Sequence, residues 1–519
     1  MYTIGIVGTG ISALHLALML QQHGVATTVY ADKTPEQLRA GRLPNNVCRF
    51  GRTRERERAL GVDHWHFPDF EMGCAHVRVR DDPAISFRGD LTRPASYVDF
   101  RLYLPRLLED YRRRGGTVVD VAGAASALVR HQRDHDLMVV ATGGRGLGEM
   151  FARVPDRSAD RPPRYLLAGL FHGVAHTDPI GMHLEIVPGV GEIFQTPVHS
   201  LVGQVAGITF EAIPGGPWAD RVRRNYYDDP DACAATVRDL VHGTEIADRI
   251  DPDAFALTRP LDLLQGSVVP TVRVPWARLD SGRFAVAIGD AAVLNDPVTG
   301  QGGNLASAAA WELGRAIVSE SVFDERFCRD WADRLWTMAR DVTEWTGSAL
   351  GPPPQQVFDV FRAAARNQAV ADAYLDNFDD PRAMWSAMAT PERASAFLAR
   401  AGGGLAACVP DRAVVDRELR LLDALHHRDP NALYPFAARD GMLVDPHGSH
   451  RPEDWQRAVA AVGGAGRPTG MSVVELAESA LLVTYRQTGM HCSTVWRRDT
   501  AGTWAVAVHH RSPTPQESL

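Results

Sequence analysis

The fold of this chain is decided by the stretch Ile4-Gly5-Ile6-Val7-Gly8-Thr9-Gly10-Ile11-Ser12-Ala13. Its apolar start predicts a buried strand, and the apolar run over residues 14–23 predicts a helix. A second strand is expected over residues 26–30, which completes a βαβ unit with Asp32 at its end. In such units the first glycine makes the turn and the second lets the backbone approach a pyrophosphate. The stretch therefore predicts dinucleotide binding by Gly8, Gly10, Ser12 and Ala13, with Asp32 at the ribose.

A second informative stretch covers residues 289–304 and reads Gly-Asp-Ala-Ala-Val-Leu-Asn-Asp-Pro-Val-Thr-Gly-Gln-Gly-Gly-Asn. A strand over residues 284–288 leads into Gly289-Asp290, where a small residue and a carboxylate suit a ribityl hydroxyl. The Pro/Gly-rich turn then begins an apolar helix at about Asn304. The free N–H groups and the positive end of that helix face the turn. This pattern indicates a site for a flat, anionic cofactor.

A third piece is the apolar segment 136–143, which ends in Thr142-Gly143. Taken alone, it is equally typical of any central strand in an α/β domain. In chain order with the other two pieces it predicts the strand beneath the cofactor. The three pieces together indicate FAD rather than NAD, because an NAD site needs only the first. The sequence shows no second glycine-rich βαβ unit for NADH or NADPH.

Composition excludes several other classes of protein. The 519 residues are 45% hydrophobic, enough for a large core and two or three domains. A net charge of -8 without a basic run argues against nucleic acid. No apolar run reaches membrane-spanning length, and the first strand starts too close to Met1 for a signal peptide. Six scattered cysteines without a C-x-x-C pair predict a reduced, cytoplasmic chain with no cysteine metal site, and no metal is expected.

Between and beyond the cofactor segments, the pattern predicts further structure. Alternating runs within residues 164–213 predict an antiparallel sheet inserted between the cofactor segments. Residues 323–397 predict amphipathic helices broken at Pro352-Pro353-Pro354. A linker is expected over residues 401–411, which begin with Ala401-Gly402-Gly403-Gly404.

Several longer motifs carry a resemblance to a known family. They include Arg42-Leu43-Pro44-Asn45, Phe87-Arg88-Gly89-Asp90-Leu91, Val98-Asp99-Phe100-Arg101-Leu102-Tyr103, Leu264-Gln265-Gly266-Ser267-Val268-Val269-Pro270 and Asp296-Pro297-Val298-Thr299-Gly300-Gln301-Gly302. On these motifs, residues 1–400 resemble the oxygenase component of styrene monooxygenase and its indole-oxidising relatives. The resemblance implies an α/β fold with a Rossmann-like FAD-binding domain over about 1–45, 98–150 and 260–320. It also implies an antiparallel β substrate domain over about 164–258 and helices over about 322–400.

The resemblance implies a two-component flavin monooxygenase. Such an enzyme receives reduced FAD from a separate NADH-dependent flavin reductase. Dioxygen then gives a C4a-hydroperoxide, which epoxidises or hydroxylates an alkene, an indole or a similar aromatic substrate. A homodimer is also expected. The alternative is an FAD oxidase or a non-catalytic flavin-binding subunit with the same fold.

The resemblance also assigns roles to residues. The catalytic pair is Asn45 and Pro297. The cofactor-binding set is Gly8, Gly10, Ser12, Ala13, Asp32, Arg42, Arg101, Thr142, Gly143, Gly289, Asp290, Pro297, Gly300, Gln301, Gly302 and Asn304. The substrate-contacting set is Leu43, Val47, Met72 and Ala75. For Asn45 the alternative is a loop asparagine that satisfies its own turn, and for Arg101 it is a surface salt bridge.

Two departures from the family pattern bear on the substrate. The family often has Tyr and His in the segment matched by residues 72–75, and His at the position of Arg49. A less aromatic and more basic lining predicts a substrate that differs from styrene and is larger. His76 adjoins this segment, and a structural role is the preferred interpretation for it.

Residues 412–511 extend beyond the usual end of that family. Helices are expected over 412–428 and 452–462, and strands over 471–476, 480–487, 491–499 and 503–510. This part resembles the SnoaL-like (ketosteroid-isomerase-like) α+β cone, which holds a small ligand or serves dimerisation. If this part were instead a hydrolase or isomerase acting on the oxygenated product, the candidate acid-base side chains would be those of Asp445, His447, His491, His509 and His510. Dimerisation is the preferred interpretation.

Overall fold

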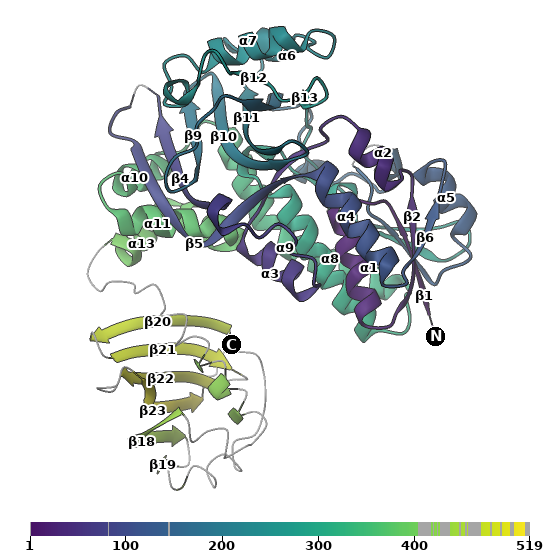
Figure 1. The fold of residues 1–519 in the computed structure, drawn as a ribbon. Helices are drawn as coiled ribbons and strands as arrows, with labels where there is room; N and C mark the ends of the chain where they lie inside the picture. The colour runs from purple at the N-terminus through teal and green to yellow at the C-terminus, as the bar shows by residue number, and fades with distance from the viewer. Residues whose placement is uncertain are drawn as a thin grey trace. The chain divides into compact units, whose positions relative to one another are not determined.

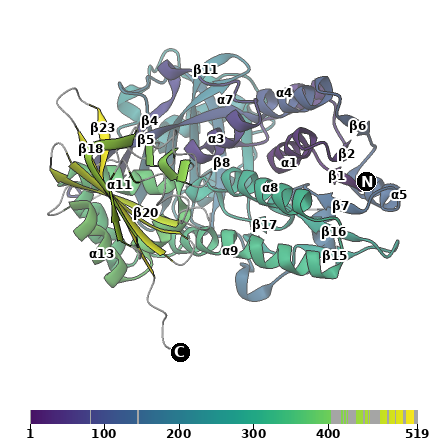
Figure 2. The same cartoon turned by 90° about the horizontal axis from the view of Figure 1, so that it is seen from below.

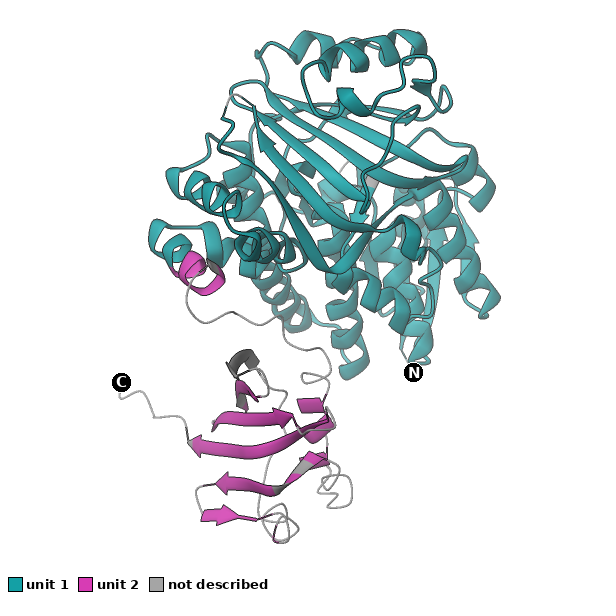
Figure 3. Cartoon of the chain, turned by 60° about the vertical axis from the view of Figure 1, so that its left-hand side comes forward, with its two compact units in different colours: residues 1–395 teal, residues 396–519 magenta. Residues whose placement is uncertain are grey.

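The computed structural model describes residues 2–80, 82–143 and 146–402. Of the C-terminal part it describes residues 417–418, 420–422, 424–425, 436–445, 448–451, 454, 469–477, 480–487, 490–498 and 503–513. The chain divides into two compact units, residues 1–395 and 396–519, which Figure 3 shows in teal and magenta. Among the described helices, none combines the length and apolar composition needed to cross a membrane.

A mainly parallel sheet forms the first layer of unit 1 (Figure 1). Its order is β15-β16-β7-β1-β2-β6. The strands are β1 (Thr3–Val7), β2 (Ala26–Ala31), β6 (Thr117–Asp120), β7 (Leu137–Val140), β15 (Trp276–Arg278) and β16 (Phe284–Ala287). The central strands are apolar throughout because helices cover both faces of such a sheet. Val7 and Ala287 both align with Val140, so the carboxyl ends of β1, β7 and β16 lie at one edge.

Helices α1 (Ile11–Gln22) and α8 (Gly302–Ser319) pack against each other and against this sheet. Residues 11–20 of α1 are all buried, which explains why this helix is apolar on every side. Helix α4 (Phe100–Arg113) begins at Asp99, whose side chain accepts a hydrogen bond from the N–H of Arg101 at 2.8 Å. Figure 2 shows α8 beside the long helix α9 (Glu325–Leu350).

The larger sheet is mostly antiparallel, with the order β12-β8-β11-β10-β9-β4-β5-β3 and with β13 paired to β8. Its strands are β3 (Asn46–Arg49), β4 (Met72–Val79), β5 (Ser86–Asp99), β8 (Tyr165–His172), β9 (Gly181–Val187), β10 (Gly191–Ser200), β11 (Gly203–Ala212), β12 (Ala256–Leu257) and β13 (Leu263–Ser267). Ile193, Ile208 and Phe210 pack on one face with residues of α6 (Ala219–Arg223) and α7 (Pro230–Leu240).

The boundary expected for this sheet, 164–258, is too narrow. Strands β3, β4 and β5, from residues 46–99, also belong to this sheet. Strands β4 and β5 form an antiparallel hairpin, and β4 pairs in parallel with β9. The sequence showed strand character only at residues 84–88 of this region. The hairpin joins the sheet through backbone hydrogen bonds to a strand distant in sequence, which local alternation does not reveal.

The remaining elements of unit 1 connect and cover these sheets. They are α2 (Pro35–Ala40), α3 (Gly51–Ala59), α5 (Ala124–His131), β14 (Thr271–Val272), β17 (Val293–Leu294), α10 (Gln355–Ala364), α11 (Gln368–Asp376), α12 (Pro381–Met388) and α13 (Pro391–Gly402). The break at residues 352–354 lies between α9 and α10, as expected. Helix α13 continues through Ala401 and Gly402, so the linker does not begin at residue 401. Residues 403–411 lie outside the described residues.

The C-terminal unit contains a sheet with the order β19-β18-β23-β22-β21-β20. Its strands are β18 (Ala437–Asp445), β19 (Gly448–His450), β20 (Thr469–Ala477), β21 (Ala480–Gln487), β22 (Met490–Arg498) and β23 (Trp504–Pro513). The four predicted strands are present, and Val483, Trp496 and Val506 form their core with Leu421. Much of the two expected helices, together with His447, lies outside the described residues.

Candidate functional site

Several predicted cofactor residues lie at the carboxyl edge of the parallel sheet. Gly8 follows β1 with φ 118°, and a Cβ there would lie 2.6 Å from the carbonyl oxygen of Ala141. Only glycine fits this close approach of two backbones. Gly10 precedes the first turn of α1 and caps it without a side chain, so the N–H groups of Ser12 and Ala13 face the edge. Such a helix start suits a pyrophosphate.

The ends of β16 and β7 continue the same edge. Gly289 has φ 61°, and a Cβ on it would lie 2.7 Å from Oγ of Ser12, so this position also requires glycine. Asp290 follows. It is exposed to solvent, but much of the space around its carboxyl is occupied by protein. That partial desolvation raises the pKa of its carboxyl to about 6.

Thr142 and Gly143 complete this edge after β7, and Asp32 lies exposed after β2. The sheet thus brings together the predicted cofactor residues at the ends of four strands, β1, β2, β7 and β16, as ligand sites at the carboxyl ends of parallel strands require. Contact with that cofactor stays a prediction for each of these residues.

The turn before α8 carries further predicted cofactor residues. Asp296 accepts a hydrogen bond from the N–H of Val298 at 3.2 Å and so begins a short 3₁₀ helix, Pro297–Thr299. Gly300 has φ 65° and reverses the chain, and α8 then starts at Gly302. Pro297 is exposed on this turn, and its place beside the reacting face stays a prediction.

The side chains of two predicted cofactor residues of this turn form hydrogen bonds within the protein. The amide of Asn304 donates to the carbonyls of Cys48 at 2.9 Å and Gly300 at 3.0 Å, and its oxygen accepts from the N–H of Phe50 at 3.1 Å. Gln301 donates to the carbonyl of Phe378 at 2.8 Å. These bonds hold β3 and the turn against the start of α8.

Arg101 lies in a buried ion-pair network. Its side chain is 1% exposed and contacts Asp99 at 2.5 Å and Asp262 at 2.7 Å. It also donates to the carbonyl of Gly41 at 3.4 Å, and the nearby N–H of Leu43 bonds to Leu261 at 2.9 Å. The surface-salt-bridge alternative for Arg101 is therefore wrong. The arginine positions the loop that carries the predicted site residues 42–45.

That loop places its side chains in different surroundings. Leu43 is buried, whereas Asn45 is exposed. The exposed guanidinium of Arg42 stacks over the ring of Tyr227 at 4.2 Å. Val47 packs beside the start of α8. A Cβ added to Gly303 would lie only 2.5 Å from Cγ1 of Val47, which shows how close the two residues are.

An apolar pocket adjoins the turn at Pro297 and has a volume of about 80 Å³. One wall is the face of the large sheet opposite to α6 and α7, and the other is the turn itself. The lining residues that the argument uses are Met72, Tyr97, Phe194, Glu211, Pro297 and Gly300. Of the predicted substrate residues, Met72 lies in this lining, and Ala75 pairs with the lining residue Met182. Leu43 and Val47 are not among the lining residues.

Arg49 does not make this lining more basic. Its side chain is fully buried in an ion pair with Glu57 and also donates to Ser96 at 2.9 Å. Tyr103 donates to Glu57 at 2.6 Å and contacts His15 at 2.7 Å. Sequence reasoning missed this buried network because its members are far apart in the chain. The signal that was available is the alternation of arginine and glutamate in helix α3, which places Glu57 on the side that this helix buries.

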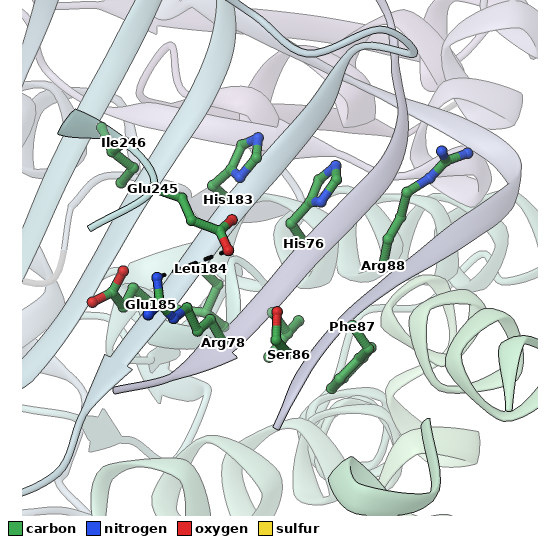
Figure 4. Close-up of a pocket in the computed structure, with 11 residues that line it drawn as sticks. His76, Arg78, Ser86, Phe87, Arg88, His183, Leu184, Glu185, Glu245 and Ile246 are labelled. Carbon is green, nitrogen blue, oxygen red and sulfur yellow. Dashed lines mark ion pairs between the residues drawn. The ribbon is translucent and has the colours of Figure 1, made fainter. Parts of the chain in front are cut away.

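His76 lies on the other face of the large sheet. A β-bulge between Met72 and Cys74 reverses the alternation of β4. His76 stacks on His183 at 4.3 Å in a separate pocket of about 240 Å³ that also contains Arg88 and Glu245 (Figure 4). The described His, Cys, Asp and Glu residues form no group of three suited to a metal ion.

Comparisons with known proteins agree with this geometry. Residues 143–245 match the family model described as the styrene monooxygenase A putative substrate binding domain. The chain is 36% identical over 397 residues to styrene monooxygenase StyA of Pseudomonas sp, covering 75% of this chain and 96% of that protein. It is 35% identical, with the same coverage, to styrene monooxygenase StyA of Pseudomonas fluorescens.

Solved structures show the same fold at low sequence identity. A flavoprotein/dehydrogenase from Cytophaga hutchinsonii is 14% identical, with a TM-score of 0.51, and the match covers 75% of this chain and 92% of that chain. The FAD-dependent chondrochloren halogenase CndH of a myxobacterium is 14% identical, with a TM-score of 0.52, over 79% and 98%. The predicted α/β class with a Rossmann-like cofactor domain is confirmed.

Proposed function

The chain belongs to the styrene monooxygenase family and is a flavin-dependent monooxygenase, and from this premise we propose its cofactor, electron supply and substrate class. We propose that it uses FAD reduced by a separate NADH-dependent flavin reductase. One atom of dioxygen enters an aromatic alkene, an indole or a similar aromatic substrate, and the other leaves as water. The observation that carries the proposal is that the turn Pro297–Gly300 borders the apolar pocket and also leads directly into α8, at whose start we propose the flavin ring.

The number of matching positions favours FAD over a mononucleotide. Four parts of a dinucleotide have matching positions: Asp32 for the ribose, the start of α1 for the pyrophosphate, Gly289-Asp290 for the ribityl chain and the turn before α8 for the ring. A mononucleotide would not need the first βαβ unit. Gly8, with its left-handed backbone and its contact to Ala141, is explained by a bound pyrophosphate at that unit.

The residues around the turn orient the reactants and exclude water. When bound, reduced FAD supplies the reaction with dioxygen. The positive end of α8 stabilises negative charge at the ring, because N–H groups at a helix start lack partners within the helix. Phe194, Met72 and Pro297 give the substrate an apolar wall, which limits the access of water. Asn45 is the polar residue proposed beside the reacting centre.

The test supplies the full-length protein with FAD, a flavin reductase, NADH and ¹⁸O₂, and offers styrene, indole and an aryl sulfide. We expect product that carries one ¹⁸O atom, detected by mass spectrometry, and product formation coupled to NADH consumption. The control is the same mixture without the protein, in which the reductase makes only hydrogen peroxide. Hydrogen peroxide as the sole product with all three substrates would argue for an oxidase instead.

A further inference from the structure

A pair of buried carboxyl groups lies at the wall of the apolar pocket. Glu211 is on β11, and Asp296 is directly before Pro297, and each residue is 1% exposed. Side chains alternate along β11, so that Ile208 and Phe210 face the core under α7 while Glu211 faces the pocket. A carboxyl group in an otherwise apolar wall costs free energy unless its oxygens have partners.

The two carboxyl groups are close enough for each to act on the pKa of the other. Among the described residues, no donor reaches Oε2 of Glu211 or Oδ2 of Asp296. The other oxygen of Asp296 accepts from the N–H of Val298. Ionised carboxylates only accept hydrogen bonds, so two of them can bond only when one carries a proton. One proton held between Glu211 and Asp296 supplies the partner that both oxygens otherwise lack.

The directions of the two pKa shifts favour Glu211 as the holder of the proton. Burial, reinforced by the adjacent charge of Asp296, raises the pKa of the Glu211 carboxyl well above its usual range. Burial also raises the pKa of Asp296, to about 6, while the hydrogen bond from Glu211 acts in the opposite direction. The positive charge of Arg164 lowers both pKa values, but its guanidinium is mainly engaged in two 2.8 Å bonds with Glu192. Burial therefore favours one shared proton on the pair, with Glu211 as its holder.

We propose that Glu211 determines substrate specificity: it donates its proton to Asp296 and accepts, on its other oxygen, a hydrogen bond from a hydroxyl or N–H group of the aromatic substrate. This inference rests on the proposed function and narrows its substrate class. Two other hydroxyl groups of the pocket already have partners. The hydroxyl of Tyr97 contacts the sulfur of Met182 at 3.4 Å, and Thr299 bonds to another threonine at 2.8 Å. A buried acceptor discriminates against a substrate without a donor, because that substrate leaves it unpaired.

The experiment compares substrates that differ only in the donor. The FAD-loaded protein with its reductase is given 4-vinylphenol, 4-vinylaniline and 4-methylstyrene, and kcat/KM is measured for each. We expect the phenol or the aniline to exceed 4-methylstyrene by about tenfold or more, mainly through KM. The two donor arms separate a hydroxyl from an N–H preference. Glu211→Leu should remove most of this preference. Glu211→Gln should retain it, because the glutamine amide can donate to Asp296 and accept from the substrate.

A second measurement does not depend on turnover. The binding of 4-ethylphenol, 4-ethylaniline and 4-ethyltoluene to the oxidised, FAD-loaded protein is measured by calorimetry, and we expect the same order of affinity and the same response to both variants. Equal affinity for all three compounds in the natural chain, or a preference unchanged in Glu211→Leu, would overturn the inference. If no vinyl substrate is oxygenated while the binding preference is present, the proposed function fails and the specificity site stands. If Glu211→Leu does not fold, the natural chain and Glu211→Gln decide the question.

Discussion

The guanidinium of Arg101 lies 2.7 Å from the carboxylate of Asp262, and each side chain is only 1% exposed. This ion pair joins the first turn of α4 to the segment directly before β13. The backbone of that segment in turn receives a hydrogen bond from Leu43. The pair therefore fixes the loop of residues 42–45, which carries Asn45, from behind the site.

Asp262→Asn should destabilise unit 1 and loosen this loop. Removing one member of a buried pair leaves a charge without full compensation, and we expect a loss of about 3 kcal/mol in the free energy of unfolding. FAD affinity should fall as well. Asp239→Asn is the matched control, because Asp239 pairs with Arg221 at the surface, and its effect should stay within about 0.5 kcal/mol. Urea unfolding and FAD titration measure both quantities. Equal effects of the two variants would contradict the anchoring role.

Gly10→Glu should abolish FAD retention and leave the fold intact. A Cβ at Gly10 meets only the carbonyl oxygen of Ala141, at 3.8 Å, so the added side chain has room. Its negative charge would occupy the place of the pyrophosphate at the start of α1. We expect FAD affinity to fall by about a hundredfold or more, with little change in the thermal unfolding of the FAD-free protein. Gly123→Glu, at the start of α5, is the control and should bind FAD normally. Normal FAD affinity in Gly10→Glu would place the cofactor elsewhere.

NADH or NADPH alone should not reduce the bound flavin. The sequence offers a single glycine-rich βαβ unit, and the proposed cofactor occupies it. Anaerobic stopped-flow absorbance should show no bleaching of the oxidised flavin within minutes, and rapid bleaching after a flavin reductase is added. Fast bleaching by either nucleotide alone would exclude the two-component proposal.

Stability should decline as the pH falls from about 6.5 toward 4, and His183 should account for part of this slope. Burial lowers the pKa of His183 to about 3, with smaller contributions from the positive charges of Arg249, His76 and His176. In the unfolded chain this histidine takes up a proton near pH 6.5, so the unfolded state binds more protons between the two values. Each such group lowers the free energy of unfolding by about 1.4 kcal/mol per pH unit in that interval.

His183→Leu should flatten this dependence by about one such group, as measured by urea unfolding at several pH values between 4 and 6.5. His242→Leu is the control, because His242 is exposed, and its curve should parallel that of the natural chain. A slope that is the same in all three proteins would show that His183 is not held neutral in the folded state.

A chain ending at Gly402 should keep flavin binding and form the same product as the full-length protein. The curated relatives match over 397 residues, and helix α13 ends at Gly402. Light scattering measures the mass of both chains, and the dimerisation hypothesis expects a dimer only when the C-terminal unit is present. Accumulation of an epoxide that the full-length chain converts further would instead favour a catalytic C-terminal unit. His509 would then be the first residue to test, because it is buried and bonds to Thr494 at 2.8 Å.

The strand ends and turns that carry most of the predicted cofactor residues could be predicted from local sequence. Gly8, Gly10 and Gly289 stand between apolar strands and helices, and their spacing alone indicates turns at the carboxyl ends of parallel strands. The structure confirms this order of elements with small shifts at their ends. Local pattern was sufficient because strand, turn and helix formation there depends on neighbours a few residues apart.

Tertiary structure decided which polar side chains meet. The sequence suggested a surface role as the alternative for Arg101 and a basic pocket lining from Arg49, whereas both are buried in ion pairs. It gave no sign that Glu211 and Asp296 share a wall of the pocket. The sequence around a glutamate in a strand or an aspartate in a turn does not show whether its side chain faces water or another carboxyl group. Their chemistry depends on burial and on partners far away in the chain, which only the packing of the large sheet against the turn before α8 supplies.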